Sequence, residues 1–393
     1  MTGPDTDRAR RRAAFAGIFV VTLLALLSVG AVLPVLPRYV KGPLGAGDVA
    51  VGVVIGAFAF TGLFGRPVAG LIADTRGRRP AIVLGSLLAS TAGFLYFVPA
   101  GVPGLIVARL FLGAGEGMVF TAGATWVVDL APPDRRARVI GLYGLAVWTG
   151  LSLGPPIGEL LLHAFSYQVV WAFAAAAPLL GAVVAMRVHD QFTPAPSAQR
   201  GPLIAPESLR PGLVLALASV GYATMAAFVV LHLDAQGIGH GATVFGAFAA
   251  MVVLTRLIGG DLPDIVGPAR CATVAASVEA AGLIMIAAAP SLAVALAGAL
   301  AMGAAFSLLY PSLSLIVVGQ VPETRRGAAL GTFTAFFDAG VGLGAPVAGV
   351  VAATAGYGAA FVTASFAAAA AAITVAIALS ARGRAMLAAS RAR

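Results

Sequence analysis

Four charged residues lie within long apolar stretches of the sequence, and they are the groups best suited to chemistry. Arg109 and Glu116 share one stretch, and their spacing of seven residues would put both on one face of a helix, two turns apart. Asp338 and Glu279 each lie in the middle of a further stretch. A carboxylate in apolar surroundings is costly unless it is protonated or paired, so each acid is a candidate proton carrier. By the same reasoning, Arg109 is expected to face the protein interior and to have a partner.

The sequence offers few residues for metal binding, disulfide formation or enzymatic catalysis. The chain has one cysteine, Cys271, which excludes disulfides and thiolate metal clusters, and only four histidines for a zinc or haem site. The sequence shows no Walker lysine motif and no Ser/His/Asp constellation. We therefore expect no metal, no cofactor, no ATP-driven step and no enzymatic activity.

The composition places these charges in a membrane. Of 393 residues, 60% are apolar and 10% are charged, whereas soluble domains are about 25% charged. The apolar residues suffice for roughly twelve stretches of the ~20 residues that cross a lipid bilayer. The net charge of +9 comes from arginines clustered between the apolar stretches. That pattern indicates loops that face anionic lipid rather than a nucleic-acid partner.

Twelve membrane-spanning helices are predicted from the apolar stretches and the turn residues between them. With the N-terminus in the cytoplasm, 20 basic residues fall on the cytoplasmic side and 2 on the outer side, which predicts that both termini are cytoplasmic. The predicted spans are about 15–37, 48–71, 81–99, 103–128, 138–162, 168–187, 211–233, 242–262, 271–289, 292–318, 328–353 and 357–380.

A polar interval rich in proline divides the chain into two halves of six spans. Residues 189–210 are predicted to form an irregular cytoplasmic linker between a first bundle at 1–188 and a second at 211–393.

The two halves repeat at a constant offset of 190 residues. Arg66 aligns with Arg256 and Asp74 with Asp264, and several glycines align in the same register. Because each half has an even number of spans, both halves have the same orientation in the membrane. The predicted fold is therefore an all-α membrane protein with twelve transmembrane helices in two parallel-related six-helix bundles.

The loop between the second and third spans carries a motif of glycines and charges. It reads Gly70-Leu-Ile-Ala-Asp74-Thr75-Arg76-Gly77-Arg78-Arg79 and resembles the signature of the major facilitator superfamily, from which only Thr75 departs. We expect Gly70 to permit a close helix approach and Gly77 to supply a tight turn. The resemblance implies that Asp74 contacts the start of the eleventh span near Gly327 and that Arg78 pairs with Asp129. These contacts would latch the cytoplasmic side in the outward-open state.

The fourth span also resembles the superfamily, through the motif Arg109-x-x-x-Gly113-x-Gly115-Glu116-Gly117. The resemblance implies a role in proton coupling for Arg109 and Glu116. An ordinary packing seam at Gly113 and Gly117 would explain the glycines but not the two charges.

The fifth span resembles the antiporter motif that the superfamily carries mainly in proton-coupled exporters, above all the multidrug pumps. It reads Gly150-Leu-Ser-Leu-Gly154-Pro155-Pro156-Ile157-Gly158-Glu159, with Glu159 in place of a glycine. The glycines are expected to let this span pack tightly on the eighth span or on the opposite bundle. Glu159 and His163, four residues apart, are expected to pair near the outer end.

The implied fold lines a central cavity with the first, fourth, seventh and tenth spans and flanks it with the eleventh. This placement favours Asp338 as a coupling residue over Glu279, which lies in a peripheral span. An aromatic and methionine-rich cavity would suit large apolar or cationic molecules, although at helical spacing about half of its candidates would only pack the bundles. The candidate cavity residues are Met118, Phe120, Tyr222, Met225, Phe228, Met302, Phe306 and Tyr310.

The expected function is secondary transport in the bacterial inner membrane, with export of a small amphipathic compound in exchange for protons. Alternating access would rock the two bundles around a midplane site, and the superfamily resemblance implies a monomer. Two alternatives stay open: a sugar or other metabolite transporter of the same fold, and a non-transporting membrane sensor or lipid translocator. The scarcity of Asn and Gln in the spans disfavours a sugar.

Overall fold

The structure, a computed structural model, describes residues 4–131, 136–188, 205–322 and 325–391, and its regular elements there are all helices. The first half of the chain forms α1 (Pro4–Val32), α2 (Val35–Lys41), α3 (Asp48–Arg76), α4 (Arg78–Leu95), α5 (Gly101–Leu130), α6 (Arg136–Ala164) and α7 (Tyr167–Arg187). The second half forms the 3-10 turn η2 (Pro206–Ser208), α8 (Leu209–Ala235), α9 (Gly241–Gly259), α10 (Leu262–Val266), α11 (Pro268–Ala287), α12 (Leu292–Val318), α13 (Arg326–Ala355) and α14 (Tyr357–Arg391). The predicted all-α membrane fold is confirmed.

In the described part of the chain, eleven helical segments are long and apolar enough to cross a membrane. The other long helix, α4, has 18 residues and begins with Arg78 and Arg79, which lower its mean hydropathy. The predicted first span lies within a single candidate span, Arg10–Lys41, which consists of α1 and the short α2 with a turn at residues 33–34 between them. Pro34 lies in this turn, where its missing N–H cannot continue the hydrogen-bond pattern of α1.

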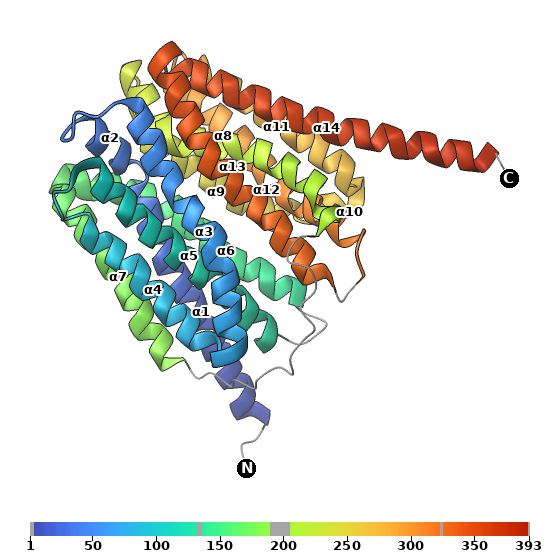
Figure 1. The fold of residues 1–393 in the computed structure, drawn as a ribbon, viewed down its shortest axis with the longest axis horizontal. Coiled ribbons are helices and arrows are strands. Elements are labelled where there is room, and N and C mark those ends of the chain that lie inside the picture. Colours follow the sequence, from blue (N-terminus) through green and yellow to red (C-terminus); the bar gives the residue numbers. More distant parts are fainter. Residues whose placement is uncertain (1–3, 132–135, 189–204, 323–324, 392–393) are drawn as a thin grey trace.

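The helices pack in two groups that follow the order of the chain. Figure 1 shows α1–α7 in blue to green as one group, and α8–α14 in yellow-green to red as the other. Within the first group α5 packs on α3 and α4, and α6 on α1; within the second, α11 packs on α12 and α14, and α8 on α13. Most of the predicted linker, residues 189–204, lies outside the described residues. We call the two groups the first and the second bundle.

The bundles meet mainly through two helix pairs, α3 with α13 and α6 with α9, with smaller contacts of α8 with α2 and α3. We call the end that carries α2 the outer end and the end with the α3–α4 turn the inner end, after the predicted orientation. Near the outer end, Gly52 of α3 lies against the main chain of Ala345 in α13, and Gly56 lies against Gly342. These glycines let the two backbones approach closely.

Toward the inner end the bundles diverge. Among the residues that the structure describes, none comes within 4 Å of the position that a Cβ would take at Gly70 of α3 or at Gly331 of α13. The expected close helix approach at Gly70 is therefore not seen among the described residues in this conformation. From the close contacts at Gly52 and Gly56 and their absence among described residues at Gly70, we infer that this conformation is open at the inner end, which faces the cytoplasm in the predicted orientation.

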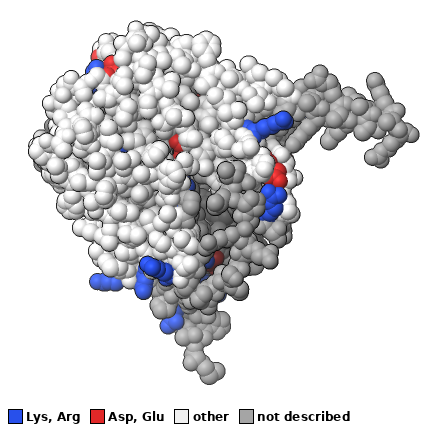
Figure 2. All heavy atoms as spheres, viewed as in Figure 1, with Lys and Arg blue, Asp and Glu red and all other residues white. Residues whose placement is uncertain are grey.

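The surface between the two ends suits a lipid environment. Figure 2 shows a broad face of uncharged atoms, with most of the visible blue and red groups near its margins. Large apolar side chains are strongly exposed there, among them Phe60, Leu160, Ile258 and Phe366. An apolar surface of this extent marks contact with lipid rather than with water.

Candidate functional site: a buried charge cluster between the bundles

The centre of the site is an ion pair that joins the two bundles. Arg66 of α3 donates from Nε to Oδ2 of Asp338 in α13 at 2.8 Å and from one terminal nitrogen to Oδ1 at 3.2 Å. Asp338 is only 2% exposed. The pair lies where the helices begin to separate, since Gly62, one turn before Arg66, is the last glycine of α3 in contact range of α13.

A second acid approaches the same guanidinium from within the first bundle. Glu116 of α5 lies 3.9 Å from a terminal nitrogen of Arg66. Phe120, one turn further along α5, places its ring 5.0 Å from the guanidinium carbon. Arg66 therefore stands between two carboxylates of different bundles. Removing one partner of a buried pair of this kind costs about 3–5 kcal/mol, because it leaves an uncompensated charge.

Arg66 was missed as a site residue in the sequence analysis, where it was noted only as a repeated arginine. Its repetition at Arg256, with glycines in the same register, was the available signal. Two arginines at equivalent depths of two apolar helices indicate that a charge at this position has a functional role.

Arg109 faces the interior and has partners, as expected, but Glu116 is not one of them. Its fully buried side chain donates to the main-chain oxygens of Val54 at 3.2 Å and Ile55 at 3.0 Å, both in α3. Seven residues of α-helix also separate the two positions by about 10.5 Å. Arg109 thus joins α5 to α3 within the first bundle, and the geometry gives it no direct contact with the charge cluster.

The motif at the α3–α4 turn is only partly described. Gly77 connects α3 to α4 with a φ of +101°, which a glycine adopts without strain. Arg78 pairs with Asp129, at the end of α5, with 2.9 Å between Nε and Oδ2. Arg76 and Arg79 are exposed. The side chains of Asp74 and the surroundings of Gly327 lie outside the described residues.

The glycines of the antiporter motif were expected to face the eighth span, which is α9, or the opposite bundle. The structure shows that they face neither. Gly150 lies against Leu26 and Leu27, Gly154 against Gly30, and Gly158 against the main chain of Ala31, so all three face α1. Helical spacing places the three glycines on one face of α6, but it does not tell which neighbour that face meets. Contact with α9 is made instead by Ser152 and Pro156, on another face, and the helix continues through Pro155.

Gly158→Ala is expected to destabilise the protein, because the new methyl group would overlap the main-chain oxygen of Ala31. Overpacking of this kind costs about 1–3 kcal/mol. Gly70→Ala is the matched control, since both changes add the same helix former but no described residue lies within 4 Å of the new methyl group at Gly70. The unfolding midpoint in mild detergent should fall for Gly158→Ala alone. Equal midpoints for the two variants would contradict the close packing of α6 on α1.

Ion pairs close the outer end. Arg38 of α2 pairs with Glu159 of α6 in its own bundle and, at 3.0 Å, with Asp234 at the end of α8 in the second bundle. His163 contacts the same Glu159, with 3.0 Å between Nε2 and Oε1. All of these side chains are partly exposed, so each pair contributes about 1 kcal/mol or less to closure.

The eight candidate cavity residues separate into two sets. Four are exposed by 3% or less and lie in the packed interior in this conformation: Met118, Met225, Phe228 and Met302. The other four lie toward the opposite bundle or beside the charge cluster: Phe120, Tyr222, Phe306 and Tyr310. Phe306 meets Trp148 of α6 across the bundle interface, with 5.6 Å between ring centroids, and Tyr222 stacks on Phe306 at 5.7 Å.

Glu279 is fully buried in α11, and neither of its carboxylate oxygens has a hydrogen-bond partner. A Cβ at Gly221 of α8 would lie 2.7 Å from its Oε1, so a glycine is needed there to make room. An unpaired carboxylate at such a position is costly, and we expect the acid to be neutral. It lies within the second bundle, where α11 faces Gly221 of α8.

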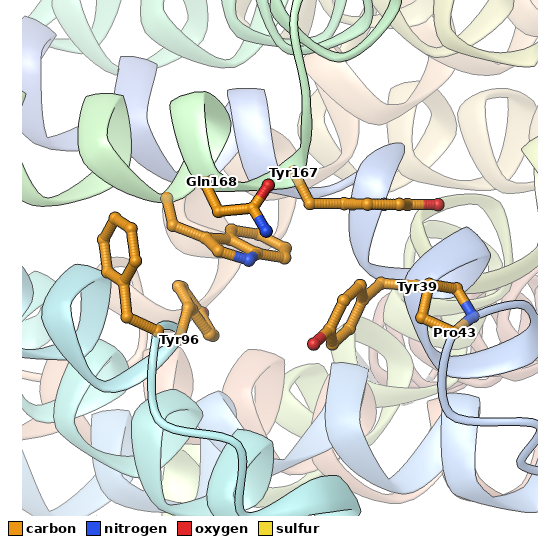
Figure 3. Close-up of a pocket in the computed structure, with 7 residues that line it drawn as sticks. Tyr39, Pro43, Tyr96, Tyr167 and Gln168 are labelled. Carbon is orange, nitrogen blue, oxygen red and sulfur yellow. The ribbon is translucent and has the colours of Figure 1, made fainter.

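A separate aromatic cavity of about 340 Å³ lies at the outer end of the first bundle. Figure 3 shows Tyr167 and Gln168, from the start of α7, above the cavity, with Tyr39 and Tyr96 on its other side. All of its walls belong to one bundle, so it lies off the interface at which the two bundles meet. Tyr and Trp are typical of the level at which a membrane protein meets the lipid headgroups.

Comparison with known proteins identifies the family of this fold. A sequence model of the Major Facilitator Superfamily matches residues 18–291 and 212–391. Uncharacterized MFS-type transporters of Burkholderia mallei and Salmonella typhimurium are each 33% identical, over 88% of this chain and 87% and 92% of their own lengths. Among solved structures, the human organic anion transporter MFSD10 (TM-score 0.73, 19% identity, 95% of this chain and 100% of its own) and the nucleoside transporter NupG (0.74, 14%, 94% and 99%) share the fold.

Proposed function

Because the chain belongs to the major facilitator superfamily of transporters, we propose that it exports small amphipathic compounds in exchange for protons, from the bacterial cytoplasm across the inner membrane. The single observation that carries the proposal is the ion pair between Arg66 and Asp338, which joins the two bundles at the point where they diverge. A charge-dependent contact at that point links protonation to the relative position of the bundles.

With Asp338 ionised, the pair favours the conformation that is open at the inner end. Protonation removes the negative charge, and Arg66 then loses its partner in the second bundle. Glu116 stays beside Arg66 in the first bundle, at 3.9 Å, and keeps the guanidinium compensated while the bundles move. Protonation would thus shift the population toward the conformation that is open at the outer end.

Exchange requires that the transporter does not switch while it is empty. The empty, deprotonated protein is held by the Arg66–Asp338 pair, which either a proton on Asp338 or a substrate group that draws Arg66 away would release. Because only a proton or a substrate releases this contact, the transporter exchanges one for the other and does not let protons leak across. A proton gradient directed inward then drives export. Asp338, Arg66 and Glu116 are the proposed coupling residues, and the geometry gives no support for Arg109 in this role.

The amphipathic character of the cargo is supported by what lies beside the charge cluster. Phe120 stands next to Arg66, and Trp148 and Phe306 meet across the bundle interface. Aromatic rings next to charges suit a molecule with an apolar body and one polar group. Proteins of the same fold are named as transporters of organic anions and of nucleosides, which makes another metabolite the main alternative cargo.

The proposal is tested by transport into proteoliposomes under an imposed pH gradient, with lipophilic cations, aromatic anions, nucleosides and sugars as labelled substrates. We expect accumulation of an amphipathic substrate that collapses when a protonophore is added. Accumulation that resists the protonophore would reject proton coupling. Lipid scrambling without transport of any solute would favour the lipid translocator instead.

A further inference from the structure

Arg256 of α9 is a second, partly buried arginine at the bundle interface, and it has no carboxylate partner among the residues that the structure describes. Its Nε is buried and makes no hydrogen bond. One terminal nitrogen lies 3.2 Å from the position that a Cβ would take at Gly144 of α6, so the side chain reaches the first bundle. An uncompensated cation in this position is costly unless something else supplies the negative charge.

The internal repeat shows what Arg256 lacks. The offset of 190 residues that relates Arg66 to Arg256 also relates Glu116 to Phe306 and Trp148 to Asp338. The two acids that flank Arg66 thus correspond to two aromatic residues on the side of Arg256. The structure brings these two rings together, and Trp148 follows Gly144 by one helical turn on the face of α6 that Arg256 reaches.

Tyr310 of α12 supplies a second donor near the same place. By the same offset it corresponds to Phe120, whose ring lies beside Arg66. Its hydroxyl lies 2.8 Å from the hydroxyl of Thr334 in α13. A guanidinium and a phenol hydroxyl are both donors to an anionic oxygen.

We propose that Arg256 binds an anionic group of the transported substrate, with Tyr310 as a further donor and with Trp148 and Phe306 as the wall for its apolar body. The substrate class is an amphipathic organic anion, such as an aromatic carboxylate or sulfonate. This inference rests on the proposed transport function and narrows its cargo. The aromatic composition alone would suit apolar or cationic molecules. An anion is the better fit because the uncompensated charge at the cavity wall is positive.

The test is equilibrium binding to the purified full-length protein in detergent, without a pH gradient. The probes are naphthalene-2-sulfonate and the 2-naphthyltrimethylammonium ion, which share a ring system and differ in charge. We expect the wild type to bind the anion at least about tenfold more tightly than the cation, since hydrogen bonds to charged groups contribute about 1.5–3 kcal/mol. Arg256→Gln should lose this preference, and Arg256→Lys should keep part of it, because lysine keeps the charge but not the fork of donors.

Arg187→Gln is the control, because Arg187 is an exposed arginine at the inner end of α7 and its removal should leave binding unchanged. Equal or absent binding of the two probes by the wild type, or unchanged anion binding by Arg256→Gln, would overturn the assignment. If Arg256→Gln fails to fold, as judged by its elution profile, the assignment is tested by the other two proteins. It then requires that the wild type prefers the anion and that Arg256→Lys shows a weaker preference. Because no proton gradient is present, a failure here is distinguishable from a failure of proton-coupled export.

Discussion

Asp338→Asn is expected to abolish pH-driven export while leaving the protein folded and inserted. Asparagine has the size of aspartate but cannot carry the charge that holds Arg66 across the bundle interface. Loss of about 3 kcal/mol from that contact would change the preference between the two conformations by about a hundredfold. In proteoliposomes the variant should show no accumulation above empty vesicles under a pH gradient. Exchange of internal for external substrate, which needs no net proton movement, should persist.

Glu207→Gln is a suitable control for this experiment. Glu207 also pairs with an arginine, Arg325 at 3.0 Å, but both side chains are about one-third exposed and lie within the second bundle. Exposed pairs of this kind contribute about 0–1 kcal/mol, so the control should export at the rate of the wild type. Full pH-driven export by Asp338→Asn would contradict the role of Asp338 as the proton-coupling residue.

Arg66→Gln is expected to cause the largest loss of stability among single changes in the charge cluster. It leaves Asp338 and Glu116 buried without their cation, at a cost of about 3–5 kcal/mol. The double variant Arg66→Gln/Asp338→Asn removes both charges of the pair, and most of the lost stability should return. Unfolding midpoints of the wild type, both single variants and the double variant would complete a double-mutant cycle, with an expected coupling energy of at least about 2 kcal/mol.

The matched cycle uses the partly exposed pair of Arg38 and Asp234 at the outer end, in the forms Arg38→Gln and Asp234→Asn. Its coupling energy should stay below about 1 kcal/mol. If the coupling energy between Arg66 and Asp338 is no larger than that between Arg38 and Asp234, the central pair is not a strong contact between the bundles. Export should remain absent in the Arg66→Gln/Asp338→Asn variant even where its stability recovers, because no titrating group then links the bundles.

The helices and their order followed from the apolar stretches, because a span of the bilayer requires about 20 apolar residues whatever surrounds it. The tight turn at Gly77 followed from the motif between the second and third spans, and the structure gives it the positive φ that favours glycine. The break before α2 was not predicted, although Pro34 and Pro37 were visible in the sequence, because an apolar stretch continues through both.

The neighbours of each helix could not be predicted from spacing. The glycines of α6 share a face, but only the packed structure shows that this face meets α1. Arg109 and Glu116 also share a face of α5, yet Arg109 finds main-chain oxygens of α3 that carry no sequence signal. Arg66 became a site residue only when the fold brought Asp338, 272 positions away in the chain, to its side.

The central claim is that ionised Asp338, through Arg66, holds the conformation that is open at the inner end. Spin labels at Arg187→Cys in the first bundle and Gln320→Cys in the second, both exposed near the inner end, would report that opening by double electron–electron resonance. The buried Cys271 would be replaced by alanine. We predict long distances at alkaline pH, a shift to shorter distances on acidification, and short, pH-independent distances in Asp338→Asn. Wild-type distances that do not change with pH, or the same pH-dependent shift in Asp338→Asn, would contradict the account.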